Sequence, residues 1–560
     1  MNDCPLAELK SHRSDCSMTA DPVYKSDGVV ARVHSLSSAE LQYPTLAIIN
    51  NETGEETIVT KDWTDEEERR LVRKLDSIVI PILFFAFFLL QLDRGNISNA
   101  YTDESLTKML KLDNTRINIA SALFSSGIVI FEVPFNVALQ RLSPSVFLSS
   151  QILIWGIIAT IQYRMDNLRS FYVLRFVLGA AEAGFIPGGL YYLSTWYKKS
   201  ELGLRHTFYY FGNLTASALS GLIAAEILDR LPGYAGLEGW QWIFVIEGVA
   251  SIGYAIVFLL LLPESAQHPA AFWNNRWFYF NERERSILRQ RVILDEPSKI
   301  ISTEKTSYTD IKSTLKNPVL WLHLMITVSS LQTGSALSSY IPLIIESFGF
   351  TVFEANARSS IPKWCSMILM LILTFTSKHF KPKGASILFA LLWQLVSQIM
   401  LRELPADATS NQRFTALCFL ITAGISGHVL NCSWMSQNFR NPRERSIAFA
   451  ILIMAANIGG VTGGQILRNG DKPLYRKGFL ALIILDVFSI AAVIFAMGFY
   501  YHMNRKADQL YGKLSSTDLE DERGNENNSF LDKTIHVGFA AGGLEDEDVK
   551  VTSNAFRYTL

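Results

Sequence analysis

Two pairs of opposite charges stand inside long apolar stretches of this 560-residue chain. Asp93 and Arg94 end the run IVIPILFFAFFLLQL, and Arg175 and Glu182 belong to RFVLGAAEAGFIPGG. An ionised side chain in the apolar core of a membrane costs roughly 2.5–3.5 kcal/mol on insertion scales. Such residues persist where they pair or line a water-filled path. The two pairs therefore indicate the binding or movement of a charged species within apolar surroundings.

Helical geometry limits what each pair can do. Neighbouring residues of a helix point about 100° apart, so Asp93 and Arg94 cannot share a face. One of them can face a cavity while the other points toward a neighbouring helix. Arg175 and Glu182 are separated by nearly two turns and share a face roughly 10 Å apart, which suits an anion, or Asp93 itself, between them. Two other interpretations stay open: Asp93 and Arg94 reach the membrane surface, or the charges only join helices.

Further polar residues in apolar segments are candidates for substrate hydrogen bonds. Asn96 lies one turn beyond Asp93, while Asn213 and Asn431 lie in later segments. Each amide can bond to a substrate or to another helix. Weaker candidates, which also suit helix packing, are Glu132, Glu247, Asp486, His323 and His428.

Twelve apolar segments are available to position these side chains. Apolar residues make up 49% of the chain and charged residues 18%, against a usual charged share of about 25%. A helix that spans a membrane needs about 20 mostly apolar residues. The predicted segments are 76–98, 115–139, 146–164, 170–195, 204–228, 240–262, 318–345, 355–377, 384–401, 412–435, 445–467 and 478–502.

The layout of these segments predicts an all-α integral membrane protein with twelve transmembrane helices in two six-helix bundles. A faint repeat supports two related halves, because Trp196 and Trp434 each precede a basic stretch and then an apolar helix. The predicted parts are a disordered N-terminal tail (1–75), an N-terminal bundle (76–262), a central loop (263–317), a C-terminal bundle (318–503) and an acidic disordered C-terminal tail (504–560).

Charge and motif content exclude several other classes. Lys and Arg are more numerous in the tails, the central loop and the connections on the same side of the membrane than in the connections on the other side. This predicts that both termini are cytosolic. The net charge of −1 gives no basic surface for nucleic acid. The scattered cysteines fit neither a disulfide framework nor a zinc site. No GxxxxGK[ST], HExxH or GxSxG occurs, so we expect no ATP-driven pump, no enzyme, no metal and no cofactor.

Four stretches closely resemble the allantoate permease group, which belongs to the anion:cation symporters of the major facilitator superfamily. They are LDRGNISNA, RFVLGAAEAGFIPGGLYYLSTWYKKSELGLR, GWQWIFVIEG and SWMSQNFRNPRERSIAFA. The resemblance extends from about Asp76 to Met503. It departs from the superfamily pattern between segments two and three, where NVALQRLSPSV retains Arg141 as its clear basic residue. This puts the usual charge clamp at the inner gate in doubt.

The resemblance implies roles for the four charged residues. Asp93 and Glu182 match the acids that carry coupling protons in related organic-anion symporters. Arg94 and Arg175 match the arginines that hold the substrate carboxylate or the coupling charge network. It implies import of a small organic anion, such as a vitamin acid, a ureide or a sulfonate, together with protons.

We therefore expect a secondary active transporter that works by alternating access. Its partners would be a small organic anion, protons and the lipid bilayer, and it would act as a monomer in the plasma membrane. The alternative is a transporter-like receptor that senses a nutrient and signals through its cytosolic tails.

Overall fold

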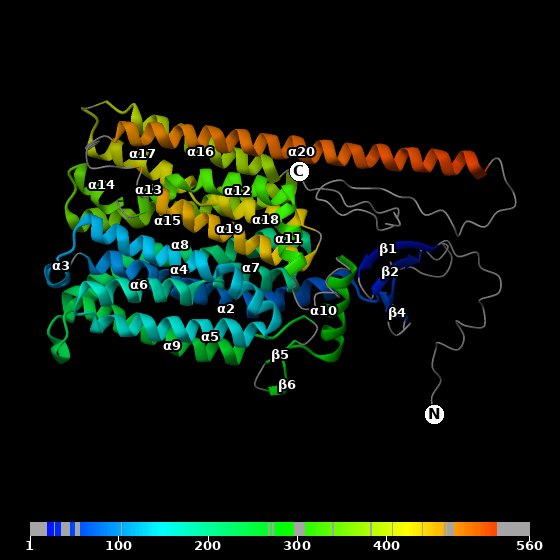
Figure 1. The fold of residues 1–560 in the computed structure, drawn as a ribbon, viewed down its shortest axis with the longest axis horizontal. Coiled ribbons are helices and arrows are strands. Elements are labelled where there is room, and N and C mark those ends of the chain that lie inside the picture. The colour runs from blue at the N-terminus through cyan, green and yellow to red at the C-terminus, as the bar shows by residue number, and fades with distance from the viewer. Residues whose placement is uncertain are drawn as a thin grey trace.

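The protein is seen in a computed structural model as a set of long helices that run side by side (Figure 1). The structure describes residues 20–26, 29–34, 45–50, 56–101, 103–266, 269–271, 274–295, 308–338, 341–380, 383–405, 407–439, 441–463, 466 and 475–522.

The first half of the chain forms one group of helices. Its long members are α2 (Asp65–Ala100), α4 (Asn114–Arg141), α5 (Pro144–Ile161), α6 (Leu168–Glu182), α7 (Phe185–Trp196), α8 (Leu202–Arg230) and α9 (Gly239–Leu261). Short elements join them: α3 (Glu104–Leu110), η1 (Gln162–Arg164), η2 (Lys199–Glu201) and η3 (Tyr234–Gly236). We call this group the N bundle.

The second half forms the C bundle. It contains α12 (Pro318–Ser330), α13 (Gln332–Ser338), α14 (Ile341–Ser347), α15 (Val352–Phe380), α16 (Lys383–Arg402), α17 (Ser410–Ala423), α18 (Ser426–Asn438), α19 (Pro442–Gly463) and α20 (Arg476–Glu522). Between the bundles lie β5 (Ala270–Ala271), β6 (Asn274–Phe278), α10 (Glu282–Asp295) and α11 (Tyr308–Lys316).

The predicted all-α membrane fold is confirmed, with one segment built differently. Among the described residues, 11 helices or helix pairs are long and apolar enough to cross a membrane. The predicted seventh segment, 318–345, is divided into α12, α13 and α14. Polar and small residues, including Gln332, Thr333 and Gly334, follow the end of α12, and a glycine inside a helix costs about 1 kcal/mol relative to alanine.

The ends of the helical region differ from the predicted boundaries. α2 begins at Asp65 rather than 76, because Thr64 and Glu67 form a capping box in which each side chain bonds the other's backbone N–H. α20 continues to Glu522, beyond the predicted limit at 503. Four antiparallel strands lie in the stretch predicted as a disordered N-terminal tail: β1 (Ala20–Ser26), β2 (Val29–His34), β3 (Thr45–Asn50) and β4 (Glu56–Thr60).

The central loop attaches to one end of the N bundle through α10. Arg291 is fully buried and its guanidinium contacts Glu68 at the start of α2 (3.2 Å) and Glu201 at the start of α8 (2.6 Å). Lys198 also pairs with Glu68. We call this end of the molecule the α10 end and the opposite end, which carries α3, the α3 end (Figure 1).

The fourth predicted segment is broken where its sequence indicates. α6 ends at Glu182 and α7 begins at Phe185, with Gly184 at φ +80° between them. Glycine tolerates this left-handed backbone without a Cβ clash. The Gln151 amide donates to the Ala183 carbonyl at 2.5 Å, so the carbonyl freed by Pro187 is satisfied. The break leaves Glu182 at the end of α6.

Close contact between α4 and α6 depends on glycine. A Cβ on Gly179 would lie 2.0 Å from the Phe124 carbonyl oxygen, and one on Gly127 would lie 2.4 Å from the Phe176 carbonyl oxygen. Small residues allow such close backbone approach in membranes, where lipid provides no hydrophobic drive for helices to associate. This contact brings the Phe124 ring of α4 to the arginines described next.

Candidate functional site

Arg94 and Glu182 form an ion pair between α2 and α6. Arg94 Nε lies 2.6 Å from Glu182 Oε2. The Glu182 side chain is fully buried, whereas 16% of the Arg94 side chain is exposed. The capped start of α2 and the break after Glu182 place both groups at the bundle's interior. The Glu182 carboxylate therefore has a cationic partner that solvent can still reach.

Arg175 lies beside this pair and shares an aromatic ring with Arg94. The Phe124 ring centre is 4.6 Å from the Arg175 guanidinium carbon and 5.6 Å from that of Arg94. Arg175 is buried, and its Nε and Nη1 have no hydrogen-bond partner in the structure. Two guanidinium groups thus surround one carboxylate. Because arginine stays protonated, the three ionised groups carry a net charge of +1 and keep free N–H donors.

Asp93 bonds to α9, and its carboxyl is also close enough to Glu182 to interact with it. Its Oδ2 accepts a hydrogen bond of 2.7 Å from Ser251 on α9, and the side chain is buried. Glu247, also on α9, is close enough to interact with the Asp93 carboxyl. The angle of about 100° between neighbouring helical residues turns Asp93 toward α9 while Arg94 meets Glu182.

The three predicted asparagines lie in different surroundings. Asn96 is buried next to Glu247. Asn213 donates to Gln91 at 2.9 Å and is partly exposed, within the N bundle. Asn431 donates to the His323 carbonyl and to Thr327, both at 3.0 Å, and its Oδ1 lies 2.6 Å from His323 Nδ1. A substrate at Asn431 would have to displace one of these partners.

Two acids ranked as weaker candidates join the N-bundle polar region. Glu132 is buried on α4 near Arg94 and the Gly184 backbone. Glu247 is buried near Asp93 and Asn96. The sequence marked each of them only as an acid inside an apolar segment. Neither has a basic residue three, four or seven positions away in the sequence, so nothing local indicated its partners.

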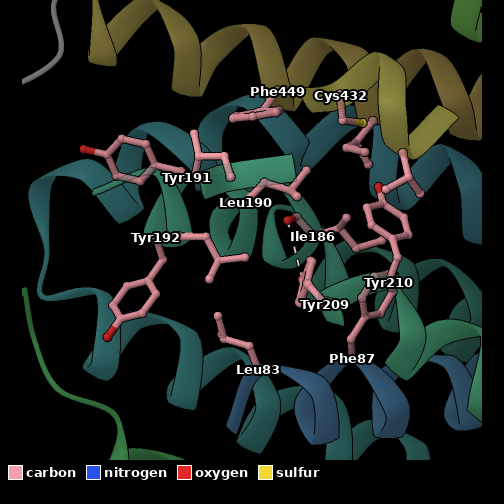
Figure 2. Close-up of a cluster of buried hydrophobic side chains, with 14 of the residues drawn as sticks. Leu83, Phe87, Ile186, Leu190, Tyr191, Tyr192, Tyr209, Tyr210, Cys432 and Phe449 are labelled. Carbon is pink, nitrogen blue, oxygen red and sulfur yellow. Dashed lines mark hydrogen bonds between the residues drawn. The ribbon is translucent and has the colours of Figure 1, made fainter. Parts of the chain in front are cut away.

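The bundles meet in the half of the molecule nearer α10. Polar contacts cross this seam, among them Thr207 with Thr374 (2.7 Å), Asn136 with Ser446 (2.6 Å), Gln437 with the Lys199 carbonyl (2.8 Å) and Tyr210 with His428 (3.4 Å). Figure 2 shows Phe449 and Cys432 of the C bundle facing Leu190 and Tyr210 of the N bundle. The seam therefore closes the region between Arg94 and the α10 end.

The Major Facilitator Superfamily model matches residues 83–464, from the middle of α2 to the end of α19. The chain belongs to the major facilitator superfamily. It is thus a multi-pass membrane protein and a secondary transporter of the superfamily type.

Relatives and solved structures agree with this membership. The superfamily member is 27% identical over 458 residues to the Major facilitator-type transporter hxnP of Emericella nidulans, covering 80% of this chain and 88% of the relative. It is 26% identical to the High-affinity nicotinic acid transporter of Saccharomyces cerevisiae, covering 78% and 79%. The proton:xylose symporter XylE bound to 6-bromo-6-deoxy-D-glucose has the same fold, with a TM-score of 0.61 at 15% identity, covering 75% of this chain and 95% of that chain.

The site of this superfamily member consists of two guanidinium groups and one carboxyl group. In the part of the chain that the structure describes, no group of three His, Cys, Asp or Glu side chains is arranged to hold a metal ion. The Arg94, Arg175 and Glu182 cluster provides an anchor for an anion and one group that can gain or lose a proton.

Proposed function

We propose that the protein imports a small organic anion together with protons, and that a carboxylate is the first candidate. The observation that supports this proposal is the unequal charge of the cluster: two arginines face one carboxylate, and Arg175 keeps two unpaired N–H donors. A carboxylate is planar and has two acceptor oxygens, so it fits the fork of donors on a guanidinium. Binding it would cancel one unit of the cluster's positive charge.

Nicotinate is the first candidate within this class. The relative from Saccharomyces cerevisiae carries nicotinic acid in its name, and a flat ring with a carboxylate suits arginines that already lie over the Phe124 ring. Ureides and sulfonates are the other candidates, because we propose that the chain belongs to the allantoate permease group of anion:cation symporters. Asn96, Asn213 and Asn431 are proposed to assist binding after local rearrangement.

Proton coupling follows from competition for Arg94. An ionised Glu182 occupies Arg94 Nε at 2.6 Å. When Glu182 takes up a proton it becomes neutral, its attraction for the guanidinium falls, and Arg94 becomes available to the substrate carboxylate. Release of substrate would let Arg94 return and the proton leave. Asp93, with Glu247 nearby, is proposed as the second proton carrier.

Membrane voltage explains why more than one proton would be useful. An inside-negative potential opposes entry of an anion by about 2.3 kcal/mol per charge per 100 mV. One proton cancels the charge of a monocarboxylate, and a second adds a net positive charge that the potential draws inward. Two carboxyl groups in the N bundle, Glu182 and Asp93, therefore match the requirement.

Alternating access would then work through the two bundles. The seam of Thr207, Asn136, Gln437 and Tyr210 closes the path toward the α10 end, which we propose is the cytosolic end. Opening that seam while the α3 end closes would carry the substrate across. We propose a monomer in the plasma membrane with both termini in the cytosol. No described contact favours the receptor alternative.

Uptake by purified protein in lipid vesicles tests the proposal. Labelled nicotinate, a ureide and a sulfonate are each offered with an inward proton gradient, with and without an inside-negative potential. We expect accumulation of one carboxylate or sulfonate that collapses when a protonophore is added. Arg230→Ala, at an exposed ion pair with Glu226, is the matched control and should transport normally. Accumulation that ignores the proton gradient, or transport of none of the anions by active preparations, would contradict the proposal.

A further inference from the structure

A second isolated carboxyl group lies in the C bundle, far along the chain from the Arg94 cluster. Asp486 on α20 is fully buried. Gln394 donates from Nε2 to both of its oxygens, at 2.8 and 3.0 Å, and Gln398 donates from Nε2 to Oδ2 at 2.7 Å. Both glutamines lie on α16, one turn apart, and are buried. The carboxyl is thus held by amides, and no cation bonds to it in the described part of the chain.

The same two amides connect Asp486 to the interruption in the seventh segment. Gln394 Nε2 also donates to the carbonyl of Ser330, the last residue of α12, at 3.3 Å. Gln398 Nε2 also donates to the Thr333 hydroxyl in α13, at 2.7 Å. The carboxyl is therefore linked to both helices that flank Leu331. The remaining amide oxygen, Gln398 Oε1, is buried and has no hydrogen-bond partner.

No charged side chain of the neighbouring helices takes part in this arrangement. On α16 the basic residues Lys383 and Arg402 lie at the two ends, and Lys383 bonds Ser433. On α12 the titratable residue is His323, which bonds Asn431 and Tyr500 of α20. α13 carries no titratable residue. On α20 itself, the ionisable residues nearest to Asp486 along the helix lie more than two turns away: Arg476, Lys477, Tyr500, Tyr501 and His502.

We propose that Asp486 is a proton-binding site whose occupancy sets the arrangement of α12 and α13. As an anion, Asp486 accepts from the two amides, as the structure shows. On taking up a proton, the carboxyl gains an O–H donor and needs an acceptor. The unpartnered Gln398 Oε1 provides it if the amide turns about its last side-chain bond. That turn replaces the Gln398 N–H donor at Thr333 with an acceptor oxygen, so the Thr333 hydroxyl must reorient and the contact between α13 and α16 must rearrange.

The site differs in kind from the Arg94 cluster. An anion could not bind at Asp486, since the surrounding donors already point at a carboxylate and no cation is present to attract a second one. Neutral amides around a carboxyl allow a proton to bind and leave without breaking an ion pair. The proposal therefore adds a proton site outside the substrate path, and it does not depend on which anion is carried or on the role of Glu182.

Infrared difference spectroscopy of the purified full-length protein in lipid tests the protonation. We expect a pH titration to show the carbonyl band of a buried protonated carboxyl, and Asp486→Asn to remove one component of it. Glu354→Asp, at an exposed helix start, is the control and should leave the band unchanged. The titration is repeated in sodium chloride and in choline chloride. An unchanged band in Asp486→Asn, or a shift produced by sodium at constant pH, would overturn the proton assignment.

Hydrogen exchange at residues 326–338 tests the link to α13. After correction for the intrinsic pH dependence of exchange, we expect wild-type protection in this stretch to fall at least several-fold as pH is lowered. Asp486→Asn should remove the pH dependence, because the amide cannot change its charge. Glu182→Gln should retain it, which separates this proposal from the proposed transport mechanism. The same pH dependence in wild type and Asp486→Asn would refute the coupling.

Discussion

Glu182 in the N bundle and Asp486 in the C bundle are both fully buried acids, yet their partners differ. Glu182 faces two guanidinium groups and pairs with Arg94 at 2.6 Å, whereas Asp486 is held by the amides of Gln394 and Gln398. An ion pair in an apolar region depends on both members, because removal of one leaves an unpaired buried charge. Amide donors carry no charge and tolerate either protonation state of their partner.

This difference separates two tasks that a symporter must perform. A site that exchanges its own carboxylate for a substrate carboxylate needs fixed positive charge, which Arg94 and Arg175 provide in the N bundle. A site that only reports pH needs a carboxyl whose neighbours can rearrange. The comparison predicts that loss of the charged partner of Glu182 lowers stability much more than neutral replacement of Asp486.

Arg94→Ala should have the largest effect. It removes the partner of Glu182 and a substrate anchor, so we expect uptake to fall at least 100-fold and stability to drop by about 3–5 kcal/mol, as for other broken buried pairs. Thermal unfolding in detergent and vesicle uptake measure the two losses. Arg94→Lys should retain part of the stability but little uptake, because lysine lacks the planar fork.

A double variant checks the reason for the stability loss. Arg94→Ala with Glu182→Gln has no unpaired charge, so stability should return toward wild type while uptake stays lost. Asp486→Asn alone should change stability by no more than about 1 kcal/mol, since amides can still pair with amides. Equal stability losses in Arg94→Ala and Asp486→Asn would break the comparison between the two acids.

Glu182→Gln should stop accumulation while it preserves binding. The amide resembles the protonated acid in shape but never releases a proton, so the empty carrier cannot reset. We expect net proton-driven uptake to fall at least tenfold, with exchange of internal for external substrate retained. Counterflow and pH-jump uptake in vesicles measure the two activities. If Glu182→Gln concentrates substrate with the wild-type dependence on external pH, the coupling proton binds elsewhere.

Gly179→Ala should have an intermediate effect through geometry alone. The added Cβ would meet the Phe124 carbonyl oxygen at 2.0 Å, so α4 and α6 must separate and the ring between the arginines must shift. Overpacking of this kind costs about 1–3 kcal/mol, and we expect uptake to fall several-fold. Gly221→Ala, where no atom lies within 4 Å of the added Cβ, is the control and should be neutral in both assays.

Sequence reasoning identified the helices and the charged residues because both signals are local. Apolar length predicts a membrane helix, and Pro187 is a local signal for the interruption that the structure contains between α6 and α7. Partners were harder to predict: Arg94 and Glu182 are 88 residues apart, and no periodicity indicates which of Asp93 and Arg94 faces α6. That direction depends on the rotation of α2 against its neighbours.

The C-bundle acid shows a signal that sequence reasoning overlooked. Gln394 and Gln398 are one turn apart within the apolar helix α16, so they share a face, and two amides on one face of a membrane helix need a buried partner. Asp486 was a candidate on its own account, but a sequence does not show that α16 and α20 are neighbours. The interruption at Leu331 was missed for the same reason, since its supporting bonds come from α16.

Paired serine variants give the smallest expected effect and compare a hydroxyl that bonds the Asp93 carboxyl with one that bonds another serine. Ser251 donates to the Asp93 carboxyl at 2.7 Å, and Ser489 donates to the Ser329 hydroxyl at 2.5 Å. Hydrogen bonds to charged groups contribute about 1.5–3 kcal/mol and those between neutral groups about 0.5–1.5 kcal/mol. Unfolding of Ser251→Ala and Ser489→Ala at several pH values therefore reports the charge of Asp93. If Asp93 carries a proton in the resting protein, the two losses should be similar at low pH, and the Ser251→Ala loss should grow as pH rises and Asp93 ionises. A Ser251→Ala loss that equals the Ser489→Ala loss at every pH would show that Asp93 does not change its charge over that range, and Glu182 would then be left as the N-bundle proton carrier.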